Sequence, residues 1–430
     1  MLELGRCIPL GLRDARSRVF RSGILRGNTE AKGPTGTHLS ADFIPRTLED
    51  LSAEWLTRVL RQGGHLETAR VTAAKLEVIG RGEGMLSLLV RVHLSYDRRE
   101  PDAPDSLIAK LPSAVRKNRA SAEVIGAYER ENDFYARVVP HFPIRVPKLY
   151  YSAMDPNPID ADPEAGARFF NRIPMWQLRW LMGGLLWLSR FSRRRYALLI
   201  EDLAEMRMGD QVGGGDRHDW ERALRALASV HAAFWQSHRL DEYDFLPRIW
   251  DSARPVQVLF QRALPGFRRH YWDALPHEVR ELAGWLTEHA VDATRSLAQG
   301  PATLVHMDYR LDNLFFDDDT GEVIVFDFQA VCVGPGVLDV ANFLGTTLPP
   351  ELCRQEELDL VRLYHRSLVA GGVDDYSQEQ CLLDYERAIS LQLQRLVSGL
   401  NSVEFDSERS RQVVSTWLKR LVGRLGGVSS

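Results

Sequence analysis

The 430-residue chain has little cysteine. Its four cysteines stand far apart and form none of the paired spacings that hold zinc; they are Cys7, Cys332, Cys353 and Cys381. Four scattered thiols also make no disulfide framework of the kind that stabilises small secreted domains. The cysteine content therefore predicts a reduced, cytoplasmic protein with no zinc site.

A long apolar run is also missing. Residues 1–23 contain several arginines but no apolar core of the secretory type. We expect residues 1–45 to form a disordered tail, with an organellar transit peptide or a start assigned too early as alternatives. A Trp-rich stretch further on has only ten residues between Arg179 and Arg190. This is too short for a membrane span, so no transmembrane segment is predicted.

Neither sign of charge dominates the composition. The chain has 54 Lys and Arg against 58 Asp and Glu, a net charge of -4. This balance gives no reason to expect nucleic acid or a strongly anionic membrane as a partner. A hydrophobic fraction of 44% is ordinary for a soluble globular protein. A chain of this length exceeds one simple core, which indicates two or three structural units.

Hydrophobic patterns divide the chain into a strand-rich part and a helical part. Three runs rich in Val, Ile and Leu predict an antiparallel sheet, at residues 73–80, 87–96 and 105–112. A helix is expected over residues 44–61 before them, and another over residues 120–139 after them. The second helix has Glu131 on its apolar stripe, where a carboxylate needs a cationic partner.

The expected fold class is α+β. Two more strands, at residues 146–155 and 196–203, flank an insertion at residues 156–195. From His218 onward the pattern is mostly helical. We predict a first unit over residues 46–203 and a helical second unit over residues 204–430.

Several polar residues lie in a short stretch that interrupts the mostly helical pattern of the second unit. Asp308 and Asn313 bracket a loop, and Asp327 follows the strand-like run "EVIVF". Carboxylate and amide oxygens suit Mg²⁺, which leaves its other positions to water and phosphate. We therefore expect Asn313 and Asp327 to hold Mg²⁺, and Asp308 to accept the proton of an attacking hydroxyl.

These residues resemble a known family. The pattern His306-x-Asp308-x-x-x-x-Asn313, followed by "DFQ" at Asp327, is similar to the catalytic and metal-binding segments of the protein-kinase-like fold. It most resembles the aminoglycoside phosphotransferase and choline kinase superfamily, and within it the CHK-type, ecdysteroid-kinase-like branch. The resemblance covers the chain from about residue 46 onward. It implies a small antiparallel-sheet lobe and a larger, mainly helical lobe that holds substrate.

The resemblance also implies nucleotide-binding residues upstream. Lys110 stands inside an apolar strand and is implied to hold the ATP phosphates, with Glu131 as its paired carboxylate. A snorkelling lysine and a helix-edge glutamate are the plainer interpretations. Glycines in "IGRGEGMLS" leave backbone amides free to approach phosphates, although a simple hairpin turn explains them too. These glycines are Gly80, Gly82 and Gly84.

The strand "YALLIEDL" resembles the hinge between the two lobes. Backbone groups at its end are implied to meet the adenine edge, and a plain core strand is the alternative. The residues concerned are Glu201, Asp202 and Leu203.

Other residues near the loop receive lesser roles. Arg310 stands two residues past Asp308, where several kinases carry a contact to the γ-phosphate, and an outward salt bridge explains it equally well. His306, His231 and Asp339 are expected to be structural.

The sequence departs from the family at two places. Met307 replaces the usual glycine between His306 and Asp308, which adds bulk beside the base. The insertion carries tryptophans among leucines, and arginines at both ends. Its residues 173–195 have three interpretations: a lid over an apolar substrate, an anchor at a membrane interface, or a helix packed on the protein's own surface.

Together these features predict a phosphotransferase with an alcohol group as acceptor, using ATP and Mg²⁺. The implied reaction moves the γ-phosphoryl group to the hydroxyl of a small molecule. A nucleotide-binding pseudokinase that serves as an interaction or membrane-associated module is one alternative. An antibiotic-inactivating phosphotransferase is another, although the Trp-rich insertion favours an apolar alcohol over a polycation. No segment of the Ala-Pro-Glu type follows Gln329, which argues against a protein kinase. The oligomeric state is not predicted.

Overall fold

The computed structural model describes residues 44–79, 86–156, 163–352, 354–402 and 408–426. These residues belong to one compact unit, Leu39–Ser430. The predicted tail lies almost wholly outside the described residues, and so do Gly80, Gly82 and Gly84.

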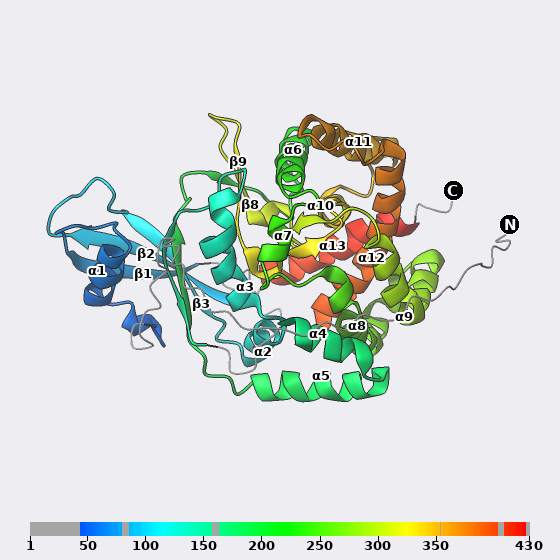
Figure 1. Cartoon of the computed structure of the whole chain (residues 1–430), viewed down its shortest axis with the longest axis horizontal. Coiled ribbons are helices and arrows are strands. Elements are labelled where there is room, and N and C mark those ends of the chain that lie inside the picture. Colours follow the sequence, from blue (N-terminus) through cyan, green and yellow to red (C-terminus); the bar gives the residue numbers. More distant parts are fainter. Residues whose placement is uncertain (1–43, 80–85, 157–162, 353, 403–407, 427–430) are drawn as a thin grey trace, which may run out of the picture. The chain divides into compact units, whose positions relative to one another are not determined.

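The first part of this unit is an antiparallel sheet of five strands in the order β1-β2-β3-β5-β4 (Figure 1). The strands are β1 (Val71–Ile79), β2 (Ser87–Tyr96), β3 (Ser106–Pro112), β4 (Leu149–Met154) and β5 (Tyr196–Glu201). Val90 and Val92 on β2 are fully buried in one cluster with Leu56 and Val59 of α1 (Ala53–Gln62). The three strand-like runs are therefore confirmed, whereas the helix before them is shorter than expected and begins at Ala53, where Ser52 caps its N-terminus.

The single helix expected over residues 120–139 is wrong. Two helices occupy this region, α2 (Arg116–Ile125) and α3 (Ala127–Asp133). Gly126 between them has a φ of 66°, a left-handed conformation that glycine adopts without a Cβ clash. The expected helical face persists within α3, where Glu131 is fully buried.

The second part is mainly helical, as expected. Its central helix is α12 (Gln378–Ser402), which contacts α8, α9, α10, α11 and α13. The other helices are α6 (Arg217–Ala233), α7 (Arg239–Glu242), α8 (Ile249–Tyr271), α9 (His277–Leu297), α10 (Val337–Thr347), α11 (Arg354–Ala370) and α13 (Glu408–Gly426). Among the described residues no helix is long and apolar enough to cross a membrane.

Short strands in this part frame the polar loop. β7 (Thr303–Val305) pairs with β10 (Cys332–Gly334), while β8 (Leu314–Phe316) pairs with β6 (Arg207–Met208) and β9 (Val323–Val325). The loop joins β7 to β8, and Asp327 stands two residues after β9. The expected loop and the expected strand before Asp327 are therefore confirmed.

The insertion forms two helices, α4 (Pro163–Arg172) and α5 (Met175–Ser189). Helix α5 lies at the lower margin of Figure 1 and contacts α2 and α8. Its Leu178 and Met182 are buried in a small apolar cluster with Val258 of α8. The boundary proposed between the two units, after Leu203, stays a prediction.

A buried carboxylate ties three helices of the second part together. Glu357 on α11 is fully buried and accepts hydrogen bonds from Arg354 at 2.6 Å and from Tyr385 of α12 at 2.5 Å. Arg424 of α13 donates to its other oxygen at 3.1 Å. The charges of Glu357 and Arg424 therefore compensate each other where water does not reach them.

We expect Glu357→Ala to lower the free energy of unfolding by about 3–5 kcal/mol, because it leaves the buried Arg424 guanidinium without its carboxylate. Urea unfolding followed by circular dichroism measures this change. The exposed Glu288 on α9 is a matched control, and its alanine variant should change stability by less than about 0.5 kcal/mol. Equal stabilities of the two variants would contradict the role assigned to the cluster.

Candidate active site

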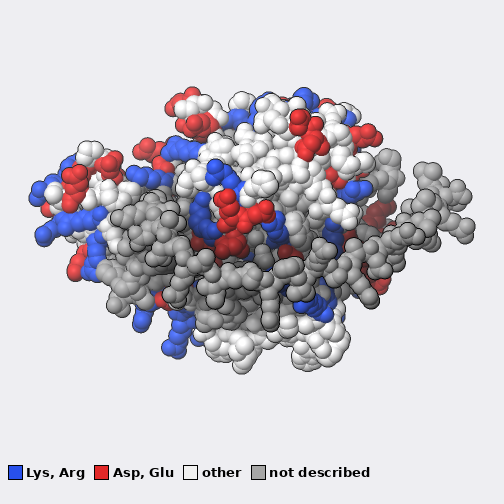
Figure 2. Space-filling model, viewed as in Figure 1, with Lys and Arg blue, Asp and Glu red and all other residues white. Residues whose placement is uncertain are grey.

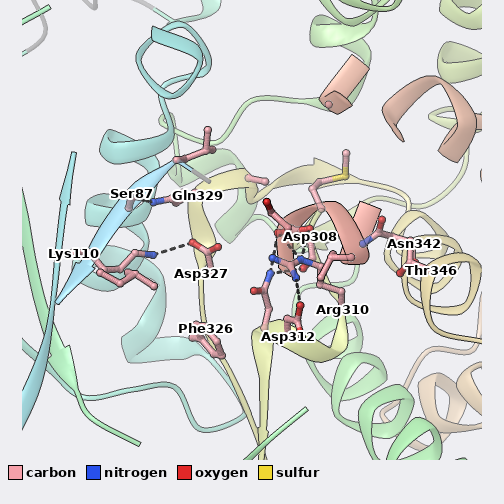
Figure 3. Close-up of a pocket in the computed structure, with 18 of the residues that line it drawn as sticks. Ser87, Lys110, Asp308, Arg310, Asp312, Phe326, Asp327, Gln329, Asn342 and Thr346 are labelled. Carbon is pink, nitrogen blue, oxygen red and sulfur yellow. Dashed lines mark hydrogen bonds and ion pairs between the residues drawn. The ribbon is translucent and has the colours of Figure 1, made fainter. Parts of the chain in front are cut away.

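Of the predicted site residues that the structure describes, all but Glu131 line one cavity of about 810 Å³, and Glu131 is fully buried behind its wall. Strands β1, β2, β3 and β5 form one wall, and the loop after β7 forms another. Helices α12 and α13 complete the part beyond this loop. Figure 3 shows Lys110 facing Asp327 from the sheet side, with Asp308 and Arg310 on the opposite side.

Lys110 joins the sheet to two distant carboxylates. Its Nζ lies 2.5 Å from Glu131 Oε1 and 2.9 Å from Asp327 Oδ1. Glu131 also accepts hydrogen bonds from Tyr196 at 3.0 Å and from Gln329 at 3.2 Å. The pairing of Lys110 with Glu131 that the sequence predicts is thus present in the structure, and Asp327 completes it.

The charged forms of Lys110 and Asp327 stabilise each other. Burial disfavours the ammonium, but Asp327 and Glu131 outweigh burial and hold the pKa of Lys110 above its ordinary value. Burial likewise opposes the charged form of Asp327, yet Lys110 keeps the pKa of this carboxyl below its usual range. For Glu131 burial prevails, and its pKa is raised.

Asp308 is held at the cavity surface by two neighbours. The Nδ2 of Asn313 donates to Asp308 Oδ2 at 2.9 Å, and Arg310 Nε lies 3.2 Å from both carboxylate oxygens. The side chain of Asp308 remains 32% exposed, whereas that of Arg310 is 8% exposed. An incoming hydroxyl therefore has access to the carboxylate, whose orientation is already fixed.

Arg310 is not the outward salt bridge that the sequence left open. It is buried, bonds Asp312 at 3.1 Å in addition to Asp308, and stacks on Trp417 of α13. The outward interpretation fails because this arginine follows a buried tyrosine and turns toward the cavity between two carboxylates. Its predicted contact with the γ-phosphate stays a prediction.

Asp339 fixes the backbone of the loop. This fully buried carboxylate on α10 accepts hydrogen bonds from the N–H groups of His306 and Met307, both at 2.7 Å. His306 in turn accepts a hydrogen bond from the N–H of Asp308 at Nδ1 and donates from Nε2 to Phe326 at 3.0 Å. Both side chains thus make the structural contacts expected of them, and they connect Asp308 to the segment that carries Asp327.

Met307 has a left-handed backbone conformation, which explains why glycine is usual at this position of the loop. Its φ is 65°, which costs a non-glycine residue about 1–3 kcal/mol. Asp339 holds its N–H group, and Arg395 of α12 donates to its carbonyl oxygen. The neighbouring groups thus stabilise the loop in a shape that methionine alone disfavours.

Arg395 is a residue that the sequence reasoning missed. It lines the cavity, and its hydrogen bonds go to the carbonyl oxygen and sulfur of Met307 rather than to a carboxylate. Burial lowers the pKa of Arg395 below its ordinary value. A signal was present, because Arg395 interrupts a largely apolar run on α12, as Lys110 interrupts its strand.

The hinge residues divide into two kinds. The side chains of Glu201 and Asp202 are engaged, Glu201 with Arg145 at 2.7 Å and Asp202 with Arg91 at 2.7 Å. The N–H of Leu203 donates to none of the described residues, and all three residues line the cavity. The backbone there is open to a ligand edge, while the two acidic side chains serve the structure.

The donor set fits a magnesium ion. Asn313 uses its amide nitrogen for Asp308, which leaves its amide oxygen for a cation, and Asp327 supplies a carboxylate. Within the described part of the chain, no group of three His, Cys, Asp or Glu residues is placed to hold a metal. Two oxygen ligands suit Mg²⁺, which retains water and takes phosphate oxygens.

Known proteins resemble this chain in sequence pattern and in fold. It matches the ecdysteroid kinase-like family over residues 81–372, more than half of its length. A comparison with curated proteins finds no matching sequence. An ethanolamine kinase from Plasmodium vivax has a TM-score of 0.51 at 10% identity, covering 87% of this chain and 89% of that one.

Two further solved structures are similar at lower scores. A choline kinase from Cryptosporidium parvum Iowa II has a TM-score of 0.48 at 10% identity, with 85% of this chain and 94% of that one covered. An amicoumacin kinase in complex with AMP-PNP and Ca²⁺ has a TM-score of 0.48 at 12% identity, with 83% and 89% covered.

The likeness to the Plasmodium vivax enzyme confirms the two-lobed, protein-kinase-like α+β fold expected from the sequence. The family match covers β2, β3, α3, the loop with Asp308 and the segment with Asp327. The chain therefore belongs to the ecdysteroid kinase-like family.

Proposed function

We propose that the protein transfers the γ-phosphoryl group of ATP to the hydroxyl of an apolar small molecule. The observation that carries the proposal is that Lys110 and Asp327 line the same cavity as Asp308 and Asn313, while the buried Glu131 pairs with Lys110 from behind. A module that only binds nucleotide has no need of all five groups. Family membership supports the same class of activity.

Lys110 is suited to hold phosphate oxygens. Its ammonium has three N–H donors, of which Glu131 and Asp327 occupy two in this structure. Glu131 anchors the side chain, so Lys110 keeps its position while a phosphate takes the remaining donor. Mg²⁺ held by Asn313 and Asp327 would offset negative charge on the phosphates. The apolar side chains of Ile79 and Ile108, near the open N–H of Leu203, suit an adenine ring.

Asp308 is suited to receive the proton of the acceptor. The hydroxyl donates to its carboxylate, and the oxygen forms its bond to the γ-phosphorus as the bond to the bridging oxygen breaks and ADP leaves. The proton passes to Asp308. Because Arg310 stabilises the charged carboxylate, we assign Asp308 mainly to orienting the hydroxyl, with full proton transfer late in the reaction.

The acceptor half of the cavity is mostly apolar. Its apolar side chains come mainly from α12 and α13 and are Leu396, Leu400, Val413, Val414 and Leu421. The acids near it, Asp308 and Asp312, are both paired with Arg310, so little negative charge is left for a polycation. This disfavours aminoglycosides. Arg395 adds a positive group without a carboxylate, and we assign it to an anionic group on the acceptor.

We expect Asp308→Asn to lower the rate of phosphoryl transfer by roughly 10³-fold, because an amide cannot accept the proton. Transfer is measured by mass spectrometry, as a phosphate added to a member of a library of hydroxyl compounds. ATP binding should persist in this variant, and the exposed Asp319→Asn should behave as wild type. A wild-type protein that binds ATP but modifies nothing in a broad library would refute the proposed reaction.

We expect Lys110→Met to raise the KM for ATP by roughly 10- to 100-fold, because a charge-assisted hydrogen bond to phosphate is lost. The variant also leaves Glu131 buried without its cation, so thermal stability should fall. A double variant, Lys110→Met with Glu131→Leu, should recover stability but not ATP affinity. Lys75→Met, on the exposed side of β1, is the control. Unchanged KM in Lys110→Met would contradict the phosphate role.

We expect Arg395→Gln to raise the KM for a carboxylated acceptor by roughly tenfold, since the guanidinium no longer pairs with the carboxylate. The KM for ATP and for the methyl ester of the same acceptor should not change. Arg387→Gln, on the exposed side of the same helix, is the matched control. An equal effect on acid and ester would contradict an anion-binding role.

A further inference from the structure

Helix α5 has two unlike faces. Its inner face buries Leu178 and Met182, and Leu186 reaches the wall of the cavity. At 100° per residue, Trp176, Trp180 and Trp187 fall within about 40° of one another on the opposite face. The helix is thus fixed to the protein on one side and presents a row of tryptophans on the other.

These tryptophans are exposed to an unusual degree. Trp176, Trp180 and Trp187 are 63%, 79% and 58% exposed, and Leu188 and Phe191 are 60% and 62% exposed. Single exposed apolar side chains are common, but five large ones within sixteen residues are unusual, and the rings of Trp187 and Phe191 are in contact at 5.3 Å. We call this set, with the arginines described next, the tryptophan face.

The charges around the tryptophan face have one sign. No Asp or Glu occurs from residue 165 to residue 200, and five arginines are exposed: Arg168, Arg172, Arg179, Arg190 and Arg193. Two acids that approach from neighbouring segments are paired with arginines, Glu123 with Arg194 and Asp155 with Arg195. Along the lower margin of Figure 2, where α5 lies in Figure 1, the visible side chains are white and blue.

We propose that the tryptophan face docks on an anionic membrane surface, with α5 lying in the plane of the interface. Tryptophan rings favour the boundary between headgroups and acyl chains, and arginines beside them attract anionic lipid headgroups. A second copy of the chain fits less well, because a symmetric contact brings the same arginines together. The net charge of the whole chain conceals this local excess.

Docking there places the cavity beside the bilayer. Leu186 belongs to the docked helix and lines the same cavity as Asp308, so an apolar alcohol dissolved in the membrane has a short path to the base. This last step rests on the proposed function, whereas membrane docking does not.

The test uses the full chain and vesicles of phosphatidylcholine with or without phosphatidylserine, scored by flotation. We expect binding to vesicles that contain phosphatidylserine, weakened by salt, with a blue shift of tryptophan fluorescence. A variant with Trp176, Trp180 and Trp187 all changed to alanine should bind on the order of 100-fold more weakly. Trp285→Ala, an exposed tryptophan on α9, is the matched control and should bind as wild type.

A second variant separates charge from apolar contact. Arg179→Gln with Arg190→Gln should weaken binding to anionic vesicles roughly fivefold per arginine. Exposed arginines elsewhere, Arg70 and Arg217 changed to glutamine, are the control and should have little effect.

Three results would overturn the proposal. They are no vesicle binding by the wild type, equal losses in the tryptophan variant and in Trp285→Ala, or a self-associated wild type that the tryptophan variant makes monomeric. The last result assigns the face to a second copy. Phosphoryl transfer to a water-soluble acceptor is assayed in parallel, so a failure of docking and a failure of catalysis are read separately.

Discussion

A lysine buried in a hydrophobic strand is the constraint on which the site depends. An ammonium without a partner at the position of Lys110 would cost several kcal/mol. Glu131 and Asp327 compensate this charge, and they come from two different elements, α3 and the segment after β9. These elements cannot separate from the sheet without leaving a charge unpaired, so Lys110 and Asp327 stay next to each other.

Three aspartates around the site serve different purposes because their exposure differs. Asp339 is fully buried, and each of its two oxygens accepts a hydrogen bond from a backbone N–H group. Asp327 pairs with Lys110 and also lines the cavity. Asp308 combines an orientation fixed by its neighbours with a side chain that is 32% exposed. Burial thus separates a structural carboxylate from two that line the cavity, although all three are the same residue type.

Much of the fold was readable from local patterns. The alternation on β2 and the apolar run before Asp327 each specified their element, because burial on one or both faces constrains side chains directly. The break at Gly126 escaped, since a left-handed glycine leaves helical periodicity intact on either side of it. The inward turn of Arg310 escaped for another reason: side-chain direction in a loop depends on partners distant in sequence, here Trp417 of α13.

The left-handed glycine between α2 and α3 makes the two helices separate units. On one side of Gly126, α2 contributes Val124 and Ile125 to the cavity wall, and on the other α3 carries Glu131. A change of side chain on α2 therefore alters the wall of the cavity, while the carboxylate that pairs with Lys110 stays where it is. The shape of this wall and the ion pair behind it can vary independently of each other.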